Sequence, residues 1–367
     1  MARLESAPWQ APVNQSEEEN QNHAPSVSVV VLNFNGAPWL DRCLSSLRNQ
    51  TIFGRLEVIV ADNNSPDRSD LLAQKLVAGW RRARVIQHGV NLGFCEGNNR
   101  AAAHARGEFL FFLNNDTWLE PDCMERLLVT VESSNSQAGT PLMLDYEDDS
   151  IQSSGGAGFD IFGLMSLAPR RPTPGEIFVV GGCSYLIERE LFNRLGGFDP
   201  VFYMYADEYD LSWRLWAAGG RAILVPGARL HHRGAAAVNP VGGGKVIELR
   251  TSDSKRFYTN RNCLLLLLKN CQHILLLMVP LQVALLLAEG LVGMLLLRRW
   301  SFFKKAYLDA IFACWRLRPH VKAERRRLAA LRKRSDWAML RFFRLRLNRW
   351  EEVRNVQRHG LPKVSPK

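Results

Sequence analysis

The sequence lacks the cysteine pattern of a disulfide scaffold or of a zinc site. Its seven cysteines are scattered, odd in number and free of any Cys-x-x-Cys pair, which favours reduced thiols in a reducing, cytoplasmic compartment. A signal peptide is also missing from the first residues, because no basic segment precedes an apolar run and glutamates occupy positions 17–19. We therefore expect a chain that is not secreted.

Acidic residues are scarce at one end of the chain. Residues 298–367 contain 21 Lys and Arg but 5 Asp and Glu, so this tail carries +16, whereas the first 297 residues carry −5. A tail of this charge requires a polyanionic partner, either a nucleic acid or an anionic lipid surface.

Residues 1–25 lack apolar periodicity and are rich in Gln, Asn, Glu, Ser and Pro, so we expect a disordered leader. From residue 26, apolar runs at 27–32, 58–61, 85–87 and 109–113 alternate with helical segments at 38–48, 71–80, 97–106 and 121–132. This order predicts an α/β fold, Rossmann-like, with a mostly parallel open sheet and helices on both faces, over residues 26–256.

Within this domain we expect Asn35 to cap the first helix and residues 140–176, which are rich in Gly, Pro and Ser, to form an irregular sheet edge or loop. Further strands are expected at 179–187 and 221–225, and helices at 188–195 and 210–218.

Polar residues follow each of the first four predicted strands: Asn33 and Asn35, Asp62, Asn91, and then the run 114–116. Ligands of open α/β sheets bind beyond the carboxyl ends of the strands. These positions therefore predict a nucleotide site, although each Asn or Asp could instead form an Asx turn or cap a helix.

Three carboxylates, Asp207, Glu208 and Asp210, open a predicted helix. They could complement the helix dipole, with Asp210 paired to Arg214, or one of them could act as a general base. His231 and His232 follow a predicted strand and could complete the coordination of a metal, or could be inert.

Two aliphatic stretches, 264–268 and 274–297, precede the basic tail. The second is long enough to span a bilayer, but Arg261, Lys269, Arg298 and Arg299 flank both ends, so a single span would export the basic tail. We predict a re-entrant or interfacial hairpin over 257–299, bent at Pro280. Aromatic residues at helical spacing among Lys and Arg predict amphipathic helices over 300–367 that lie on an anionic membrane, which makes lipid a better partner than nucleic acid.

The motifs at 27–47, 60–67, 91–101, 113–116 and 196–214 resemble those of family 2 glycosyltransferases with a GT-A fold, and most closely those of rhamnosyltransferase-like bacterial members. The resemblance covers residues 26–235. It implies an inverting transfer of one sugar, rhamnose being a candidate, from a dTDP-, UDP- or GDP-sugar to a lipid-linked or glycan acceptor. Together with the predicted membrane helices, it implies an enzyme of cell-surface polysaccharide or glycolipid assembly at the cytoplasmic face of the inner membrane.

The resemblance also implies roles for the polar residues. Asn33, Asn35 and Asp62 would bind the base and ribose. Asn91, Gly93, Asn98 and Asn115 would line the rest of the nucleotide-sugar, and Asp116 with His232 would hold Mg²⁺ or Mn²⁺.

The sequence departs from the family pattern at the acidic motif, where the family reads Glu-Asp-x-Asp and this chain has Asp207-Glu208-Tyr209-Asp210. Glu208 then matches the catalytic base, with Asp207 as its rival and Asp210 as an acceptor-binding or structural residue. The inverted order leaves open a catalytically inactive, membrane-anchored nucleotide-sugar-binding protein. The Gln-x-x-Arg-Trp motif of processive synthases is absent, which favours one sugar per encounter.

Overall fold

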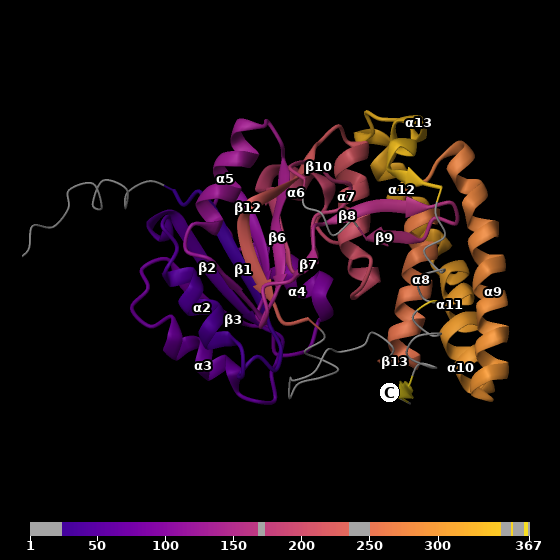
Figure 1. Cartoon of the computed structure of the whole chain (residues 1–367), viewed down its shortest axis with the longest axis horizontal. Helices are drawn as coiled ribbons and strands as arrows, with labels where there is room; N and C mark the ends of the chain where they lie inside the picture. Colours follow the sequence, from indigo (N-terminus) through magenta and orange to yellow (C-terminus); the bar gives the residue numbers. More distant parts are fainter. Residues whose placement is uncertain (1–23, 168–172, 235–249, 346–353, 355–362, 366–367) are drawn as a thin grey trace, which may run out of the picture.

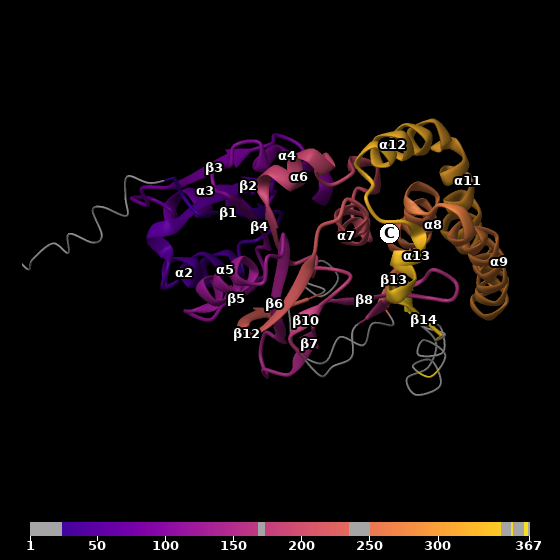
Figure 2. The same ribbon diagram turned by 90° about the horizontal axis from the view of Figure 1, so that it is seen from above.

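The structure is a computed structural model that describes residues 24–167, 173–234, 250–345, 354 and 363–365. Residues 1–23 of the predicted leader, and Leu347 and Trp350 of the predicted basic tail, lie outside the described residues. A ten-stranded sheet forms one end of the molecule, and a layer of helices from the last third of the chain forms the other (Figures 1 and 2).

The first half of the sheet is parallel, in the order β3-β2-β1-β4, with β1 Val27–Asn33, β2 Leu56–Asp62, β3 Ala83–Gln87 and β4 Phe109–Asn114. β1, β2 and β4 are apolar without alternation because helices cover both faces. One face carries α2 Leu40–Arg48, α3 Ser69–Leu76 and α5 Cys123–Ser133, and the other carries α4 Gly93–Ala102, α6 Arg189–Leu195 and α7 Asp207–Ala217. The predicted strand-helix repeats and the predicted layers are confirmed.

The second half of the sheet is mixed. β11 Ser184–Glu188 is antiparallel to both β4 and β6 Ala138–Asp145, and β12 Ala222–His232 is parallel to β6. Short strands complete it: β5 Thr117–Leu119, β7 Ile151–Ser153 and β10 Gly175–Glu176.

Three local predictions are corrected here. The region 140–176 contains most of β6, which is buried along nearly its whole length, and not only an irregular edge. β12 continues past a bulge between Val225 and Arg229 to His232, so the histidines lie within the strand and not after it. Asn35 does not cap a helix, because α2 begins at Leu40, and its φ of 54° places it in a left-handed turn.

The helical layer begins with α8 Asp253–Asn270, which packs on α7, and continues with the 3-10 helix η3 His273–Leu277, α9 Met278–Leu297 and α10 Trp300–Phe303. A π-helical turn η4 Lys304–Leu308 leads into α11 Asp309–Arg316, followed by α12 Arg318–Leu331 and α13 Asp336–Met339. Short elements complete the described chain: η1 Phe53–Arg55, η2 Pro200–Phe202, η5 Leu340–Phe342, β8 Gly156–Asp160, β9 Met165–Leu167, β13 Arg250–Ser252, β14 Phe343–Arg344 and β15 Lys363–Ser365.

Residues 257–299 do form a helical hairpin, but the chain reverses direction at residues 271–272 and not at Pro280, which is the third residue of α9. The predicted contact of this hairpin with a membrane stays a prediction. Pro is tolerated there because the first helical turn needs no N–H donor from it. Leu264–Leu267, expected at the membrane, are at most 1% exposed and belong to the protein core. Among the described residues, one helical stretch, His273–Leu297, is long and apolar enough to cross a membrane, and 22% of its most apolar window is buried.

Candidate active site

The carboxyl ends of β1, β2 and β4 bring the predicted polar residues to one edge. In the strand register Asn33 lies opposite Asp62, and Leu32 lies opposite Asn114. Asn33 Nδ2 donates to Asp62 Oδ1 at 2.7 Å and Asn115 Nδ2 donates to Asn33 Oδ1 at 2.8 Å. Gly36 is required beside this pair, since a Cβ there would overlap both amides. The edge is therefore a connected hydrogen-bond network.

Burial distinguishes two of these residues from the others. Asn33 is fully buried and Asp62 is 2% exposed, and Asp62 Oδ2 also accepts from the backbone N–H of Ser65 at 2.9 Å. Both side chains are held by hydrogen bonds within the protein, which shape the edge, and their contacts with a base and ribose stay a prediction. Asn35 is exposed, and Asn115 is partly exposed.

The start of α4 forms the neighbouring wall. Asn91 is exposed, and its Oδ1 accepts from the backbone N–H of Gly93 at 2.9 Å. Gly93 has φ 75°, and a Cβ there would overlap the ring of Tyr203, so glycine is needed twice over. Asn98 is 1% exposed, and its Oδ1, like that of Asn63, has no partner among the described residues. Buried acceptors of this kind are expected where a ligand supplies the donor.

Asp116 and His232 face each other across β5 and β12, with 3.5 Å between Asp116 Oδ1 and His232 Nε2. Gln152 Nε2 donates to the carbonyl of His232 at 3.0 Å, which turns Gln152 Oε1 towards His232 Nδ1 at 2.7 Å. Because Gln152 Oε1 can only accept, Nδ1–H is the donor of this hydrogen bond, and Nε2 faces Asp116. Burial opposes a charged imidazole, but Cys183 and Asp116 raise the pKa of His232 well above its usual value.

A carboxylate and an imidazole fit a divalent cation that takes its other ligands from phosphate oxygens and water. No group of three or more His, Cys, Asp and Glu side chains in the described part of the chain could hold a metal by itself. His231 points elsewhere, because alternate strand residues face opposite sides, and it stacks on Trp118 with ring centroids 3.6 Å apart.

The acidic motif begins α7 after a contorted loop. Tyr203, Tyr205 and Ala206 all have positive φ, at 64°, 70° and 61°. Such backbone costs on the order of 1–3 kcal/mol per residue and persists only when its surroundings hold it in place. The loop presents Glu208, which is partly exposed, whereas Asp207 is 4% exposed.

Gly182 lies between Glu208 and the Asn114–Asp116 turn. A Cβ on Gly182 would lie 3.4 Å from Glu208 Cδ, and the carbonyl of the next residue, Cys183, accepts from the backbone N–H of Asn114 at 3.0 Å. Glu208 and the 114–116 run therefore border the same strip of backbone. Residues 181 and 182 of this strip are both glycine, so the backbone carries no side chains there.

The three carboxylates of the motif differ in their electrostatic surroundings. Burial raises the pKa of Glu208. The pKa of Asp207 is raised well above its usual value, mainly by burial and also by repulsion from Glu208. Burial would raise the pKa of Asp210 too, but Arg214 and Lys269 outweigh it and lower that pKa. The predicted pair is present, with Arg214 Nη2 2.7 Å from Asp210 Oδ2.

Lys269 of α8 extends this ion-pair network. Its Nζ lies 2.8 Å from Asp210 Oδ2 and 2.6 Å from Asp199 Oδ2, and His320 of α12 also contacts Asp199 at 2.9 Å. These charges are buried but mutually compensated, so Asp210 anchors α7 to the helical layer. Its position leaves no exposed surface for an acceptor.

Asn262 of α8 is a site residue that the sequence did not reveal. It is fully buried, and its Nδ2 donates to the carbonyls of Phe202, Met204 and Tyr205 at 2.8 to 2.9 Å. These carbonyls belong to the strained loop before Glu208. The only available signal was an asparagine next to a run of leucines, which does not indicate a partner 60 residues away.

Comparisons with known proteins concern the family and the fold of this chain. The model of glycosyl transferase family 2 matches residues 28–196. The N-acetylglucosaminyl-diphospho-decaprenol L-rhamnosyltransferase of Mycobacterium tuberculosis is 30% identical over 236 residues, which are 56% of this chain and 75% of that protein. The O-antigen biosynthesis protein RfbC of Myxococcus xanthus is 31% identical over 58% of this chain and 18% of its own length. A further relative, EpsH of Bacillus subtilis, is 34% identical over a segment that covers 34% of this chain and 36% of EpsH.

Two solved structures share the fold. The S. aureus TarS 1–349 complex with UDP has a TM-score of 0.51 at 14% identity, covering 83% of this chain and 88% of that chain. GalNAc-T7 with UDP, GalNAc and Mn²⁺ has a TM-score of 0.50 at 20% identity, covering 60% and 46%. Both likenesses concern the fold, which is GT-A-like, with a mixed curled sheet between helices. Family model and mycobacterial relative together show that this chain belongs to glycosyl transferase family 2.

Proposed function

We propose that this protein is an inverting glycosyltransferase that moves one sugar from a nucleotide-sugar to a membrane-bound or lipid-linked acceptor. The observation that carries the proposal is the strip at Gly182 and Cys183, which borders both Glu208 and the Asn114–Asp116 turn. A base and a site for the leaving diphosphate must lie on either side of one sugar, and this strip borders the candidates for both roles.

Glu208 acts as the general base. It removes the proton from the acceptor hydroxyl, whose oxygen then attacks the anomeric carbon while the bond to the diphosphate breaks. A raised pKa makes Glu208 a stronger base, and its partial exposure makes it accessible to an acceptor, whereas Asp207 is buried beneath it. The pKa of Asp207 is raised as well, so accessibility to an acceptor is the property that favours Glu208 over Asp207.

Asp116 and His232 would hold Mg²⁺ or Mn²⁺, which when bound neutralises the charge that develops on the departing diphosphate. Asn91, Gly93, Asn98 and Asn115 line the nucleotide-sugar, and Asn33 and Asp62 keep the edge in shape. The inverted Asp-Glu order is compatible with this chemistry because the glutamate is the exposed member.

The donor is a dTDP-, UDP- or GDP-sugar, with rhamnose suggested by the name of the mycobacterial relative. The same name, and that of the O-antigen relative, support a lipid-linked acceptor in cell-surface polysaccharide assembly. The exposed aliphatic face of α9 supports membrane association, as an interfacial or re-entrant helix at the cytoplasmic face of the inner membrane.

The test is Glu208→Gln, with Glu190→Gln on the exposed surface of α6 as a matched control. We expect the first variant to lose transfer while it still binds nucleoside diphosphate with Mn²⁺, and the control to keep both. Near-normal turnover in Glu208→Gln would move the base to Asp207. Binding of nucleotide by the unmodified protein without transfer or donor hydrolysis would instead identify a binding protein.

A further inference from the structure

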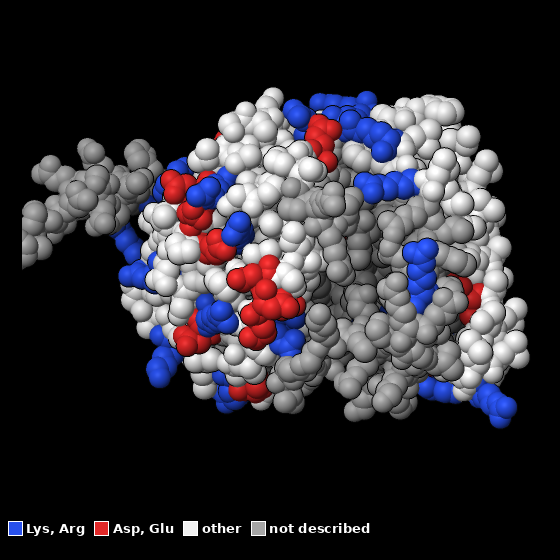
Figure 3. All heavy atoms as spheres, in the orientation of Figure 1, with Lys and Arg blue, Asp and Glu red and all other residues white. Residues whose placement is uncertain are grey.

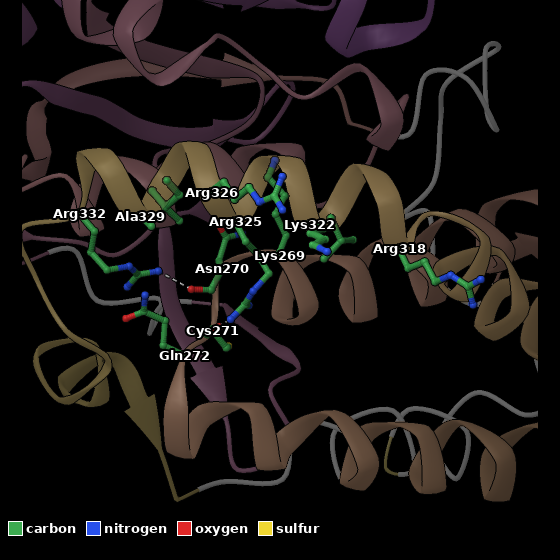
Figure 4. A pocket seen from close by; sticks show the side chains of 12 residues that line it. Lys269, Asn270, Cys271, Gln272, Arg318, Lys322, Arg325, Arg326, Ala329 and Arg332 are labelled. Atoms are coloured by element: carbon green, nitrogen blue, oxygen red, sulfur yellow. Dashed lines mark hydrogen bonds between the residues drawn. The ribbon is translucent and has the colours of Figure 1, made fainter.

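A cationic pocket lies between α12 and the turn that joins α8 to η3, away from the strip beside Glu208. Its volume is about 410 Å³. In Figure 4 the side chains of α12 and of the turn face each other across it. The end of α8 and the turn after it contribute residues 269–272. α12 contributes four cationic side chains and three apolar ones: Arg318, Lys322, Arg325, Arg326, Val321, Leu328 and Ala329.

Two of these cations have no ion-pair, hydrogen-bond or aromatic partner among the described residues, whereas Arg318 lies over the ring of Trp315. Lys322 and Arg326 lie one turn apart on α12, both are exposed, and neither forms an ion pair within the described residues. Other pocket cations are already engaged, since Arg325 donates to the carbonyls of Leu268 and Cys271. The free pair therefore gives the pocket its affinity for an anion.

Arg332 supplies a second, independent indication of a ligand. Its side chain lines the pocket and is 9% exposed, and its Nε–H has no hydrogen-bond partner among the described residues. A buried, unpaired donor on a charged group is costly. An anionic ligand in the pocket would offset the charge of this guanidinium as well as those of Lys322 and Arg326.

The surroundings of the pocket are aliphatic. Val321 and Leu328 are buried in its wall, and the adjoining stretch exposes Ile274, Leu277 and Leu281 at 46%, 64% and 50%. In Figure 3 the edge of the molecule formed by α9 is almost free of charged side chains. A ligand that matches both properties has an anionic head and long apolar chains.

We propose that this pocket binds the phosphate headgroup of an anionic phospholipid, whose acyl chains lie along η3 and the start of α9. The proposal rests on the membrane association proposed above and gives it a specific site. A free phosphate would use the cations but would leave the neighbouring leucines in water.

The test compares two charge-matched variants of the full chain by flotation with vesicles of phosphatidylcholine, with and without phosphatidylglycerol. Lys322→Ser with Arg326→Ser removes the free pair, and Lys304→Ser with Lys305→Ser removes two exposed lysines outside the pocket. We expect the pocket variant to lose roughly 10- to 30-fold in affinity for phosphatidylglycerol vesicles, and the control to lose much less. Equal losses would show diffuse attraction and overturn the pocket.

Ala329→Trp fills the pocket without changing charge, and we expect it to reduce the preference for phosphatidylglycerol as well. Its retention of the full preference would overturn the proposal. Displacement of the protein from vesicles by millimolar inorganic phosphate would identify a free phosphate as the ligand and would also overturn it. Transfer to a soluble acceptor should be unchanged in all these variants, so that failure of the pocket is distinguishable from failure of the proposed activity.

Discussion

The neighbouring helices α8 and α9 are both rich in leucine, yet they use their surfaces in opposite ways. α8 buries five polar side chains, Asp253, Asn260, Asn262, Lys269 and Asn270, together with its leucines. α9 buries Gln282, Leu286 and Gly290 and exposes many aliphatic residues, including Leu295 at 70%. The two helices lie side by side at the end of the molecule farthest from the parallel strands (Figures 1 and 2).

The difference follows from what each helix packs against. α8 faces the carbonyls and carboxylates of the loop before Glu208, which need donors when they are removed from water. α9 packs against protein on one side only. Its outer apolar face stays exposed unless a membrane or another molecule covers it. The two leucine-rich helices therefore differ in role: α8 supports the site and α9 faces the surroundings of the protein, so substitutions in each should have separate consequences.

Lys269→Met gives the largest expected effect on the folded protein. Removal of one partner from a buried ion-pair network leaves Asp199 and Asp210 undercompensated, and we expect a loss of about 3–5 kcal/mol in the free energy of unfolding, measured by urea denaturation. Lys304→Met, on an exposed lysine, is the matched control and should change stability by less than about 0.5 kcal/mol.

If Lys269→Met does not fold, the double variant with Asp199→Asn tests the same network. It should be more stable than the single variant, because it removes a carboxylate that has lost its partner. Equal stability of the single and double variants would show that Lys269 is not coupled to Asp199.

Asn262→Ala should come next, with an effect on catalysis. Loss of the Nδ2 group, which contacts three carbonyls of the strained loop, lets Glu208 move. We expect kcat to fall by about 10²-fold with a smaller change in KM. Asn260→Ala is the matched control, because Asn260 is equally buried on the same helix but donates to the carbonyl of Ala306. Both variants should lose similar stability. If kcat falls equally in both, Asn262 has no specific positioning role.

The contrast between the two helices also explains what could be predicted from the sequence. The polar edge was predictable because apolar runs mark strands and the carboxyl ends of parallel strands share one edge. Strand β6 was missed because Gly139 and Pro141 interrupt its apolar pattern, and its identity as a strand depends on pairing with β11 and β12.

Leu264–Leu267 were assigned to the membrane because composition does not distinguish a helix buried in protein from one buried in lipid. The burial of Lys269 was equally invisible, since it depends on Asp199 and Asp210, which are 70 and 59 residues away. The exposed aliphatic face of α9 was anticipated, but the location of the chain reversal was not. Long-range pairing of polar groups, unlike local periodicity, leaves no pattern in a single sequence.

The pH dependence of activity and stability should distinguish Asp210, whose charge α8 neutralises, from Glu208, whose charge it does not. Because the pKa of Glu208 is raised, the rate should fall on the acidic side with a midpoint above 4.5, the value of an ordinary glutamate. The pKa of Asp210 is lowered, so its contribution to stability is complete above the unfolded-state value near 3.8 and is lost as pH falls through the lower folded-state pKa.

The signs for Glu208 are opposite, and this gives a matched test. A carboxylate with a raised folded-state pKa destabilises the folded protein once it is ionised, so Glu208→Gln should increase the free energy of unfolding at pH 7 and have no such effect below the pKa of an unfolded glutamate. Urea denaturation at both pH values measures this. A Glu208→Gln variant that is less stable than the unmodified protein at pH 7 would contradict a raised pKa of Glu208 in the folded protein.

Substitutions on the outer face of α9 should have the smallest effect on the protein itself. Leu281 and Leu295 are 50% and 70% exposed, so Leu281→Asn with Leu295→Asn should change the free energy of unfolding by less than about 0.5 kcal/mol and leave transfer to a soluble acceptor intact. Flotation with vesicles should nevertheless be lost, because each leucine inserted into lipid contributes about 1.5–3 kcal/mol. Leu286→Asn, at a buried position of the same helix, should show the reverse, with a clear loss of stability. If both variants unfold alike, the outer face of α9 is packed against protein and the contrast with α8 does not hold.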